Sequence, residues 1–501
     1  MHQTAMTKAV AGRESLRHDR TYTPHTKGKE AMSAYTLDYT YTAPSALIDG
    51  ADSRALSLAT SGGGTPEGAA ASHPYFFSGF LERADVYATA LLIVARVART
   101  RFYVPPSSLA GALRAADPVV TSTAEGLRFE SFSACCGVYA RLDVDSSALD
   151  ASHSAVGVTN VDVNPPLRAA LASLRAGEPI HLNVGDDGLL TTTLDGSVME
   201  EKVPLPIRWL KGFAETQMLS SRMSPVHSLD AAAARTFIHS LPRNSSTKAV
   251  LWATRAVRSL RLATRATAGS VCVAGPERLR VLEPLIRHIQ RLDAYSEPVT
   301  AGNAPVPSVW VAHLPGARLS IGLSPEKSRG FSGEGSVLQA LSNPNTAQNA
   351  DMLSVLLSFE PRIDVPVMSA RAGLDEAATR DALALLASSG QVGFDAHAGE
   401  YFHRPLPVHP EALTAMHPRL VGAKKLADSG AIERVGAGEH GTGEYSVRSG
   451  ENTYTVVLPA DPYAVEGYLC SCPWWLKYRG TRGPCKHALA VSILYREHAA
   501  G

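Results

Sequence analysis

The chain has 501 residues, which is too long for one hydrophobic core and predicts roughly three or four domains. Hydrophobic residues make up 45% of it and charged residues 19%, a balance that excludes a largely disordered protein. The formal net charge is only +1, so a surface that binds nucleic acid has to be a local patch.

Residues 1–33 are expected to form a disordered tail, because they are basic and lack the apolar run of a secretory signal. Met6 and Met32 are both candidate starts. The longest apolar stretch, Val86–Ala95, is about half as long as a bilayer crossing, so we expect no membrane contact. Six cysteines are few for a secreted disulfide scaffold, which favours a cytoplasmic protein.

Residues 34–230 are expected to form an α+β domain. Ile180–Val184 and Leu189–Leu194 predict a hairpin, because Gly and Asp between them suit a tight turn. Ile207–Leu219 has helical spacing of apolar residues and follows a proline, which is typical of a helix start. The vicinal Cys135–Cys136 pair and the lone cysteine at 272 are expected to be buried free thiols.

Residues 231–345 are expected to form a basic α/β domain. Residues 243–291 contain ten Lys or Arg and two acids, a net charge of +8. Arginines recur there at steps of three and four, and on a helix they would form one stripe suited to a phosphate backbone or an acidic partner. The alternative is an exposed helix face that pairs with acids from elsewhere. These arginines are Arg255, Arg258, Arg261 and Arg265.

A glycine-rich loop, Arg329–Gly335, lies between an alternating run, Arg318–Leu323, and a helix-like segment, Ser336–Leu341. Strand, glycine loop and helix in this order could hold a phosphate. The loop lacks the Lys-Ser/Thr pair of a P-loop, and Glu334 would repel an anion, so a tight turn is favoured. Ser332 lacks the spacing of a nucleophile elbow, and we assign no catalytic residue.

Residues 346–410 are expected to hold a short helix at Met368–Ala372, a turn at Gly373, a second helix and a hairpin, an order that resembles a winged helix. The second helix would begin after Asp375 and end at Gly390, with strands at Val392–Asp395 and Tyr401–Arg404. Winged helices often read DNA with the start of that helix, which here offers one base beside one acid. A protein contact or a spacer role is therefore at least as well supported as DNA reading.

The histidines that follow are spaced too widely for a metal signature and are interpreted as ordinary loop histidines. They are His397, His403, His409 and His417. Residues 411–443 are expected to be a helical linker.

Residues 444–501 carry the strongest motif, with ligands at Cys470, Cys472, Cys485 and His487. Two strands and a third run lead into the first two cysteines, whose sulfurs would point the same way on a strand. Residues two apart on a helix diverge, so Cys485 is expected in the turn before the last helix and His487 in its first turn. Three thiolates and one imidazole close a tetrahedron with no open position, which predicts one structural Zn²⁺.

The pattern Cys-x-Cys, twelve residues, Cys-x-His, with strands before and a helix after, resembles the SWIM zinc finger. The resemblance implies a ββα module and the same four ligands. SWIM modules accompany transposases, recombination factors, ubiquitin ligases and bacterial proteins, and are thought to bind DNA or other proteins. The layout of the whole chain resembles the bacterial SWIM zinc-finger family, for which no reaction is established.

The loop between the ligand pairs is aromatic and basic, and residues 467–496 contain five Lys or Arg and no acid. Aromatic planes beside cations suit single-stranded nucleic acid, whereas shielding of the zinc by tryptophans is the alternative. The predicted nucleic-acid contacts are Trp474, Lys477, Arg479, Arg482 and Lys486, together with Arg255, Arg258 and Arg261.

Three functions stay open on the sequence. The first is a zinc-binding, non-enzymatic adaptor whose basic segments bind nucleic acid, DNA above all. The second is an adaptor that binds only protein partners. The third is an enzyme housed in residues 35–345, which lacks a recognisable acid–base pair or nucleophile motif. The sequence carries no signal for an oligomeric state.

Overall fold

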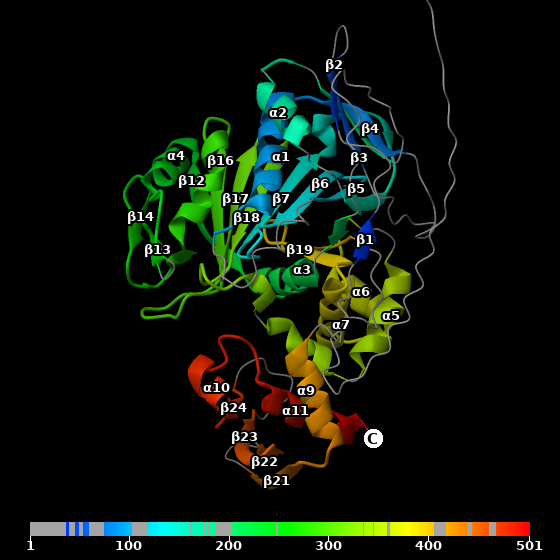
Figure 1. Ribbon diagram of the computed structural model, residues 1–501, viewed down its shortest axis with the longest axis vertical. Coiled ribbons are helices and arrows are strands. Elements are labelled where there is room, and N and C mark those ends of the chain that lie inside the picture. The colour runs from blue at the N-terminus through cyan, green and yellow to red at the C-terminus, as the bar shows by residue number, and fades with distance from the viewer. Residues whose placement is uncertain are drawn as a thin grey trace, which may run out of the picture. The chain divides into compact units, whose positions relative to one another are not determined.

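The computed structural model describes most of the chain after residue 36, and residues 36–501 form one compact unit (Figure 1). The described residues are 37–39, 46–49, 54–59, 75–102, 118–160, 163, 165–174, 176–178, 180–185, 203–205, 207–246, 249–333, 335–343, 345–357, 361–404, 417–437, 443–459 and 467–500. The expected tail, residues 1–33, lies outside them. Among the described helices, none combines the length and the apolar character that a membrane-spanning helix needs.

The largest sheet has eight strands, each antiparallel to its neighbours, in the order β12-β16-β17-β18-β7-β6-β5-β9. Its halves meet where Ile321 of β18 lies opposite Ala140 of β7. The sheet therefore crosses the boundary expected between residues 230 and 231. Its strands are β5 (Val119–Thr123), β6 (Gly126–Phe132), β7 (Val138–Asp145), β9 (Gly157–Asn160), β12 (Ser224–Asp230), β16 (Arg291–Ser296), β17 (Ser308–Leu314) and β18 (Ala317–Leu323).

Strand alternation gives the two faces of this sheet different chemistry. On β7, Val138, Ala140, Leu142 and Val144 join the main hydrophobic core, because residues two apart on a strand share a face. Helix α1 (Ala84–Arg99) covers this face with buried residues at helical spacing. The other face of β7 carries Tyr139, Arg141 and Asp143, which are also buried.

Smaller sheets surround the large one. The predicted strand at Ile180–Val184 is present, but β10 pairs in parallel with β3 and antiparallel with β4; the expected second hairpin strand lies outside the described residues. These sheets contain β1 (Leu37–Tyr39) with β11 (Val203–Leu205); β2 (Ala46–Asp49), β3 (Arg54–Ala59), β10 (Ile180–Gly185), β4 (Tyr75–Leu81) and β8 (Leu149–Ser154); and β14 (Leu260–Ala263), β13 (Val250–Arg255) and β15 (Val271–Ala274).

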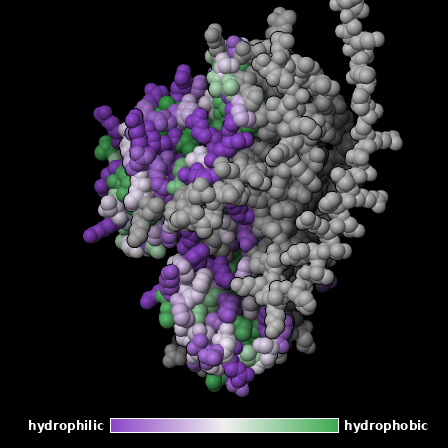
Figure 2. Space-filling model, viewed as in Figure 1, coloured by the Kyte–Doolittle hydropathy of each residue, from purple (hydrophilic) through white to green (hydrophobic). Residues whose placement is uncertain are grey.

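The arginine stripe expected on a helix is wrong, because its residues lie on a β-hairpin. Arg255 ends β13, Arg258 lies in the turn, and Arg261 belongs to β14. Arg255 is opposite Leu260 and Thr254 is opposite Arg261, so strand alternation turns Arg255 and Arg261 to opposite faces. All three are exposed, and Figure 2 shows hydrophilic residues gathered over this part of the molecule.

The structure describes several more helical segments before residue 345. The predicted helix after Pro206 is confirmed as α3 (Ile207–Ser220), which packs Phe213 against Phe132. The helix-like segment expected at Ser336–Leu341 is instead two short 3₁₀ turns. The other segments are η1 (Ser146–Ala148), α2 (Pro165–Ser173), α4 (Ala231–Ser240), η2 (Pro276–Leu285), η3 (Phe331–Gly333), η4 (Ser336–Leu338) and η5 (Ala340–Ser342).

The predicted order of helix, turn, helix and hairpin is confirmed element by element. Asp375 caps the second helix by accepting a hydrogen bond from the Ala378 N–H at 2.7 Å, and Gly373 and Gly390 adopt positive φ where the helices end. The winged-helix assignment itself stays a prediction. These elements are α6 (Val365–Ala372), α7 (Glu376–Ser388), β19 (Val392–Asp395) and β20 (Glu400–His403). A further helix, α5 (Thr346–Leu356), precedes them and was not predicted.

The C-terminal elements form a four-stranded sheet with helices beside it. The expected linker, residues 411–443, contains a helix, and it also supplies the first strand of this sheet, so the sheet begins before residue 444. The elements are α9 (Pro418–Asp428), β21 (Ile432–Ala437), β22 (Gly443–Ser449), β23 (Asn452–Leu458), β24 (Leu469–Cys470), α10 (Pro473–Tyr478) and α11 (Lys486–Ala500).

Candidate metal centre

The four predicted zinc ligands come together in the C-terminal module. One ligand atom from each of Cys470, Cys472, Cys485 and His487 lies within 4.8 Å of every other, and all four residues are buried. The three cysteines are free thiols. Because donors around a tetrahedral Zn²⁺ are separated by less than this distance, the cluster fits one ion.

Local backbone structure places each ligand. Cys470 ends β24, whereas Cys472 lies just beyond the strand and is the N-cap of α10, where its Sγ accepts the Trp475 N–H at 3.4 Å. Cys485 precedes α11, and its Sγ accepts the Ala488 N–H at 3.4 Å. Two of the sulfurs therefore sit at helix N-termini, where the backbone dipoles favour negative charge.

His487 lies in the first turn of α11, as predicted, with Nδ1 3.9 Å from the Cys470 Sγ. Its Nε2 is buried and makes no hydrogen bond with the described residues, and its ring lies against Tyr454 at a centroid distance of 4.5 Å. With Nδ1 this close to a sulfur of the cluster, His487 is placed to complete the ligand set around a metal ion.

The charge state of the cluster also fits a cation. Hydrogen bonding with Cys470 lowers the pKa of the Cys485 thiol to about 4, while the same bond and burial raise the pKa of Cys470. Burial raises the pKa of Cys472 as well. Three buried sulfurs thus resist carrying three charges on their own, and a bound Zn²⁺ would supply the positive charge that allows all three to be thiolates.

The predicted nucleic-acid contacts around the zinc divide into buried and exposed groups. Trp474 is half-buried and the Arg419 guanidinium lies over its ring at 4.9 Å, so it packs within the protein. Arg482 is half-buried and lies 4.8 Å from the Tyr478 ring. Lys477 and Arg479 are exposed. The exposed Lys486 reaches the Ser449 hydroxyl at 3.0 Å.

Two features of this region were not expected from the sequence. The ligand loop contains a short helix, α10, although Pro473 directly after a capping residue is a signal of a helix start that could have revealed it. Arg419, far away in the sequence, donates to the carbonyl oxygens of Arg482 and Pro484 at 2.6 and 3.1 Å. No pattern in the sequence indicates that Arg419 contacts the ligand loop.

A groove of about 840 Å³ runs beside the zinc module. Trp475, Leu476 and Arg479 line it from α10 and its end, and Arg222 and Arg329 line it from the preceding part of the chain. Glu297 is the one acidic residue among its described lining residues. The groove combines an aromatic ring with three guanidinium groups.

Comparison with known proteins identifies a family for only one part of the chain. No curated protein matches it. Proliferating Cellular Nuclear Antigen from Entamoeba histolytica is 7% identical, with 50% of this chain and 98% of that chain covered and a TM-score of 0.30. The PCNA2-PCNA3 complex from Sulfolobus tokodaii is 6% identical, with 50% and 100% covered and the same TM-score, 0.30. Likenesses this weak carry no argument about fold or function.

Residues 454–496, in contrast, match the family model of the SWIM zinc finger. The matched segment contains all four clustered ligands together with Tyr454, which packs on His487. The match and the geometry agree, and together they identify a SWIM zinc finger in the C-terminal region of this chain.

Proposed function

We propose that the chain is a non-enzymatic cytoplasmic adaptor whose zinc finger supports a surface for single-stranded nucleic acid. The observation that carries the proposal is the groove that Trp475 and Arg479 line together with Arg222 and Arg329. Aromatic rings stack on bases of any sequence, and guanidinium groups bind phosphates, so this combination suits a single strand.

The zinc explains how so short a helix holds its position. Cys472 lies at the start of α10, and Cys485 ends the segment that follows it. Metal binding to both fixes the ends of a segment that has no described strand pairing beyond one bridge between Thr481 and Gly483. The role of the ion is therefore structural, and it acts on the nucleic acid only through the surface that it supports.

The basic hairpin of β13 and β14 would contribute less to nucleic-acid binding. Several of the basic residues at 243–291 are used inside the protein: Arg278 is fully buried, and Arg280 and Arg291 pair with Glu283 and Asp293. The exposed Arg255, Arg258 and Arg261 do not form the single stripe that was predicted. They offer diffuse attraction to phosphates rather than a defined site.

Binding of a labelled single-stranded oligonucleotide, measured by fluorescence anisotropy over a range of salt concentrations, tests the proposal. Arg479 adopts a left-handed conformation with φ 43°, so Arg479→Asn removes the charge but keeps a residue that tolerates this backbone. We expect weaker binding and a log–log salt slope that is smaller by about 0.7. Arg255→Gln, on the distant hairpin, is the matched control and should change the slope little. Absence of salt-dependent binding by the zinc-loaded wild type would exclude the proposal.

A protein partner is the second candidate, because two leucines are exposed along the same groove. Leu469 and Leu476 are 57% and 60% exposed, and large apolar side chains in a groove often contact another protein. In this case a defined partner would co-elute after nuclease treatment, and Leu476→Asp would abolish the complex while leaving oligonucleotide binding unchanged.

A further inference from the structure

A second cluster of metal-ligating side chains lies outside the zinc finger. Asp293 comes from β16, His313 from the neighbouring β17, and His397 from the turn between β19 and β20. Ligand atoms of the three lie within 4.8 Å of one another. The cluster joins the large sheet to the hairpin that follows α7.

Strand geometry brings the first two residues together. Arg291 lies directly opposite His313, and Asp293 is two residues further along the same strand, so all three share one face of the sheet. Oδ2 of Asp293 is 2.7 Å from Nε2 of His313. Tyr295, on the same face of β16, has its hydroxyl 3.0 Å from Nδ1 of His397.

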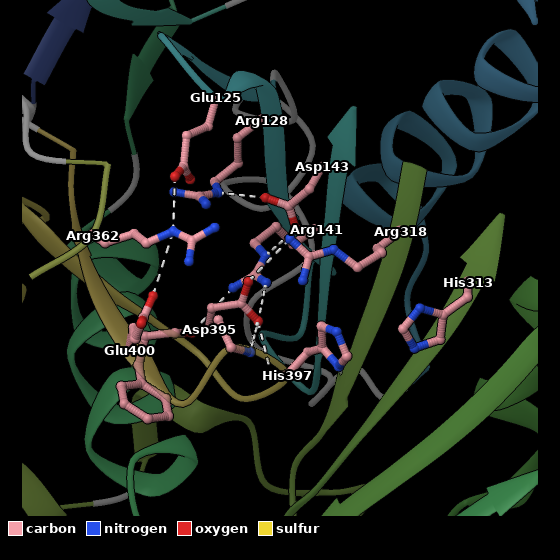
Figure 3. Close-up of polar contacts among 12 residues, drawn as sticks. Glu125, Arg128, Arg141, Asp143, His313, Arg318, Arg362, Asp395, His397 and Glu400 are labelled. Carbon is pink, nitrogen blue, oxygen red and sulfur yellow. Dashed lines mark hydrogen bonds and ion pairs between the residues drawn. The ribbon is translucent and has the colours of Figure 1, made fainter. Parts of the chain in front are cut away.

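The third residue is held in place by an ion-pair network. Oδ1 of Asp395 lies 2.8 Å from Nη2 of Arg141 and accepts the backbone N–H of His397 at 2.9 Å. Arg318 pairs with the other oxygen of Asp395 at 3.5 Å. Figure 3 shows His397 beside this network, on the side where His313 lies. Their rings meet edge to face at a centroid distance of 4.7 Å, so the turn delivers His397 to the sheet in a fixed position.

We propose that Asp293, His313 and His397 form a second metal site, which binds one divalent transition-metal ion of the Zn²⁺ or Co²⁺ class. Two imidazoles and one carboxylate are ligands that such ions prefer, and three protein ligands leave open positions for water. This site differs from the closed cage in the zinc finger, and the proposal does not depend on nucleic-acid binding.

The groups around the ligands fit this assignment. The Ser228 hydroxyl donates to Oδ1 of Asp293 at 2.7 Å, so the oxygen that the metal would take is Oδ2, which lies beside His313. The Tyr295 oxygen can accept the Nδ1–H of His397 and leave its Nε2 free. Second partners of this kind orient the ligands in protein metal sites.

Arg291 is the main competitor of the metal. Its Nε lies 3.0 Å from Oδ2 of Asp293 and its Nη2 lies 3.0 Å from Nε2 of His313. The guanidinium therefore contacts the same two atoms that a cation would bind. Its side chain is 47% exposed and can turn into solvent. If a metal ion has to displace the Arg291 side chain, then removing that side chain should strengthen metal binding. A purely structural ion-pair cluster would not give this result.

Metal stoichiometry of the full-length protein tests the proposal. Reduced, metal-free protein is titrated with Co²⁺ and then with Zn²⁺, and bound metal is counted after equilibrium dialysis. The wild type should bind two ions, only one of which shows the near-ultraviolet thiolate-to-cobalt absorption of the zinc finger. His313→Ala and His397→Ala should each bind one ion and keep that absorption.

Three further variants separate metal binding from a general loss of structure. Arg291→Gln should bind the second ion more tightly than the wild type, and Tyr295→Phe should bind it about tenfold more weakly because His397 loses its orienting partner. Cys485→Ser should lose the thiolate absorption but keep the second ion. A single ion bound by the wild type, or a second ion that survives in both histidine variants, overturns the proposal.

Discussion

Nη2 of Arg141 lies 2.8 Å from Oδ1 of Asp395, in an ion pair whose side chains are only 3% and 7% exposed. The pair joins β7 in the large sheet to the end of β19 (Figure 3). Arg141 also contacts Asp143 at 2.7 Å, so the guanidinium bridges two buried carboxylates. Burial by itself would raise the pKa of Asp395, but Arg141 and Arg318 outweigh it and hold that pKa well below its usual range.

Asp395→Ala should be strongly destabilising, because it leaves Arg141 buried with one carboxylate partner fewer. We expect the free energy of unfolding to fall by about 3 kcal/mol, as measured by urea denaturation. The matched control is Glu376→Ala, which breaks the exposed pair with Arg380 at 2.7 Å and should cost no more than about 0.5 kcal/mol. Equal denaturation midpoints for the two variants would contradict the structural role of the buried pair.

Stability should decrease as the pH falls from about 6.5 to about 4, with His403 as one contributor. Burial, followed by the charge of Arg404, lowers the pKa of His403 from 6.5 to about 4. The unfolded chain therefore takes up a proton before the folded protein does. The stabilisation is complete above the unfolded pKa and is lost as the pH falls toward the folded one, a change of up to about 3 kcal/mol. Urea midpoints between pH 7 and pH 4 should fall less steeply for His403→Gln than for the wild type; parallel curves would exclude this contribution.

Removal of the zinc-finger ion should unfold residues near 467–500 locally. Cys485→Ser leaves the other ligands without a full tetrahedron and should lose the ion and the hydrogen-exchange protection of α11, because metal binding supplies the folding energy of such small modules. Cys272→Ser is the control, since Cys272 is also a buried free thiol but lies outside the ligand cluster. Full protection of α11 in metal-free protein would show that packing alone holds this module.

The zinc site could be predicted from the sequence because its ligands lie close together along the chain. Spacing fixed the four ligands, and Gly373, Asp375 and Gly390 marked helix ends that the structure confirms. The same local reasoning placed Arg255 and its neighbours on a helix. That prediction failed because a spacing of three and four residues is also compatible with a β-hairpin.

Contacts between distant segments were beyond that reasoning. Asp293 and His397 are brought together by pairing of β16 with β17 and by the ion pair of Asp395 with Arg141, and neither leaves a local pattern. His397 therefore resembled an ordinary loop histidine in the sequence. The eight-stranded sheet was missed for the same reason, since β7 and β18 pair although they lie far apart in the sequence, and no short-range signal marks the pairing.

The glycine loop near residue 330 should prove to be a packing element. A Cβ atom at Gly330 would lie 2.3 Å from the backbone oxygen of Cys135, and the neighbouring Phe331 N–H donates to the Cys136 carbonyl oxygen at 2.7 Å. Gly330→Ala therefore has to push the loop away from the Cys135–Cys136 turn, and overpacking of this kind costs about 1–3 kcal/mol. Gly436→Ala is the matched control, because its added Cβ meets nothing within 4 Å. Thermal denaturation should show a lower midpoint for Gly330→Ala alone. Equal melting temperatures for the two variants would show that the close approach at Gly330 does not explain this glycine. The interpretation of the glycines as a phosphate-binding loop would then be favoured again.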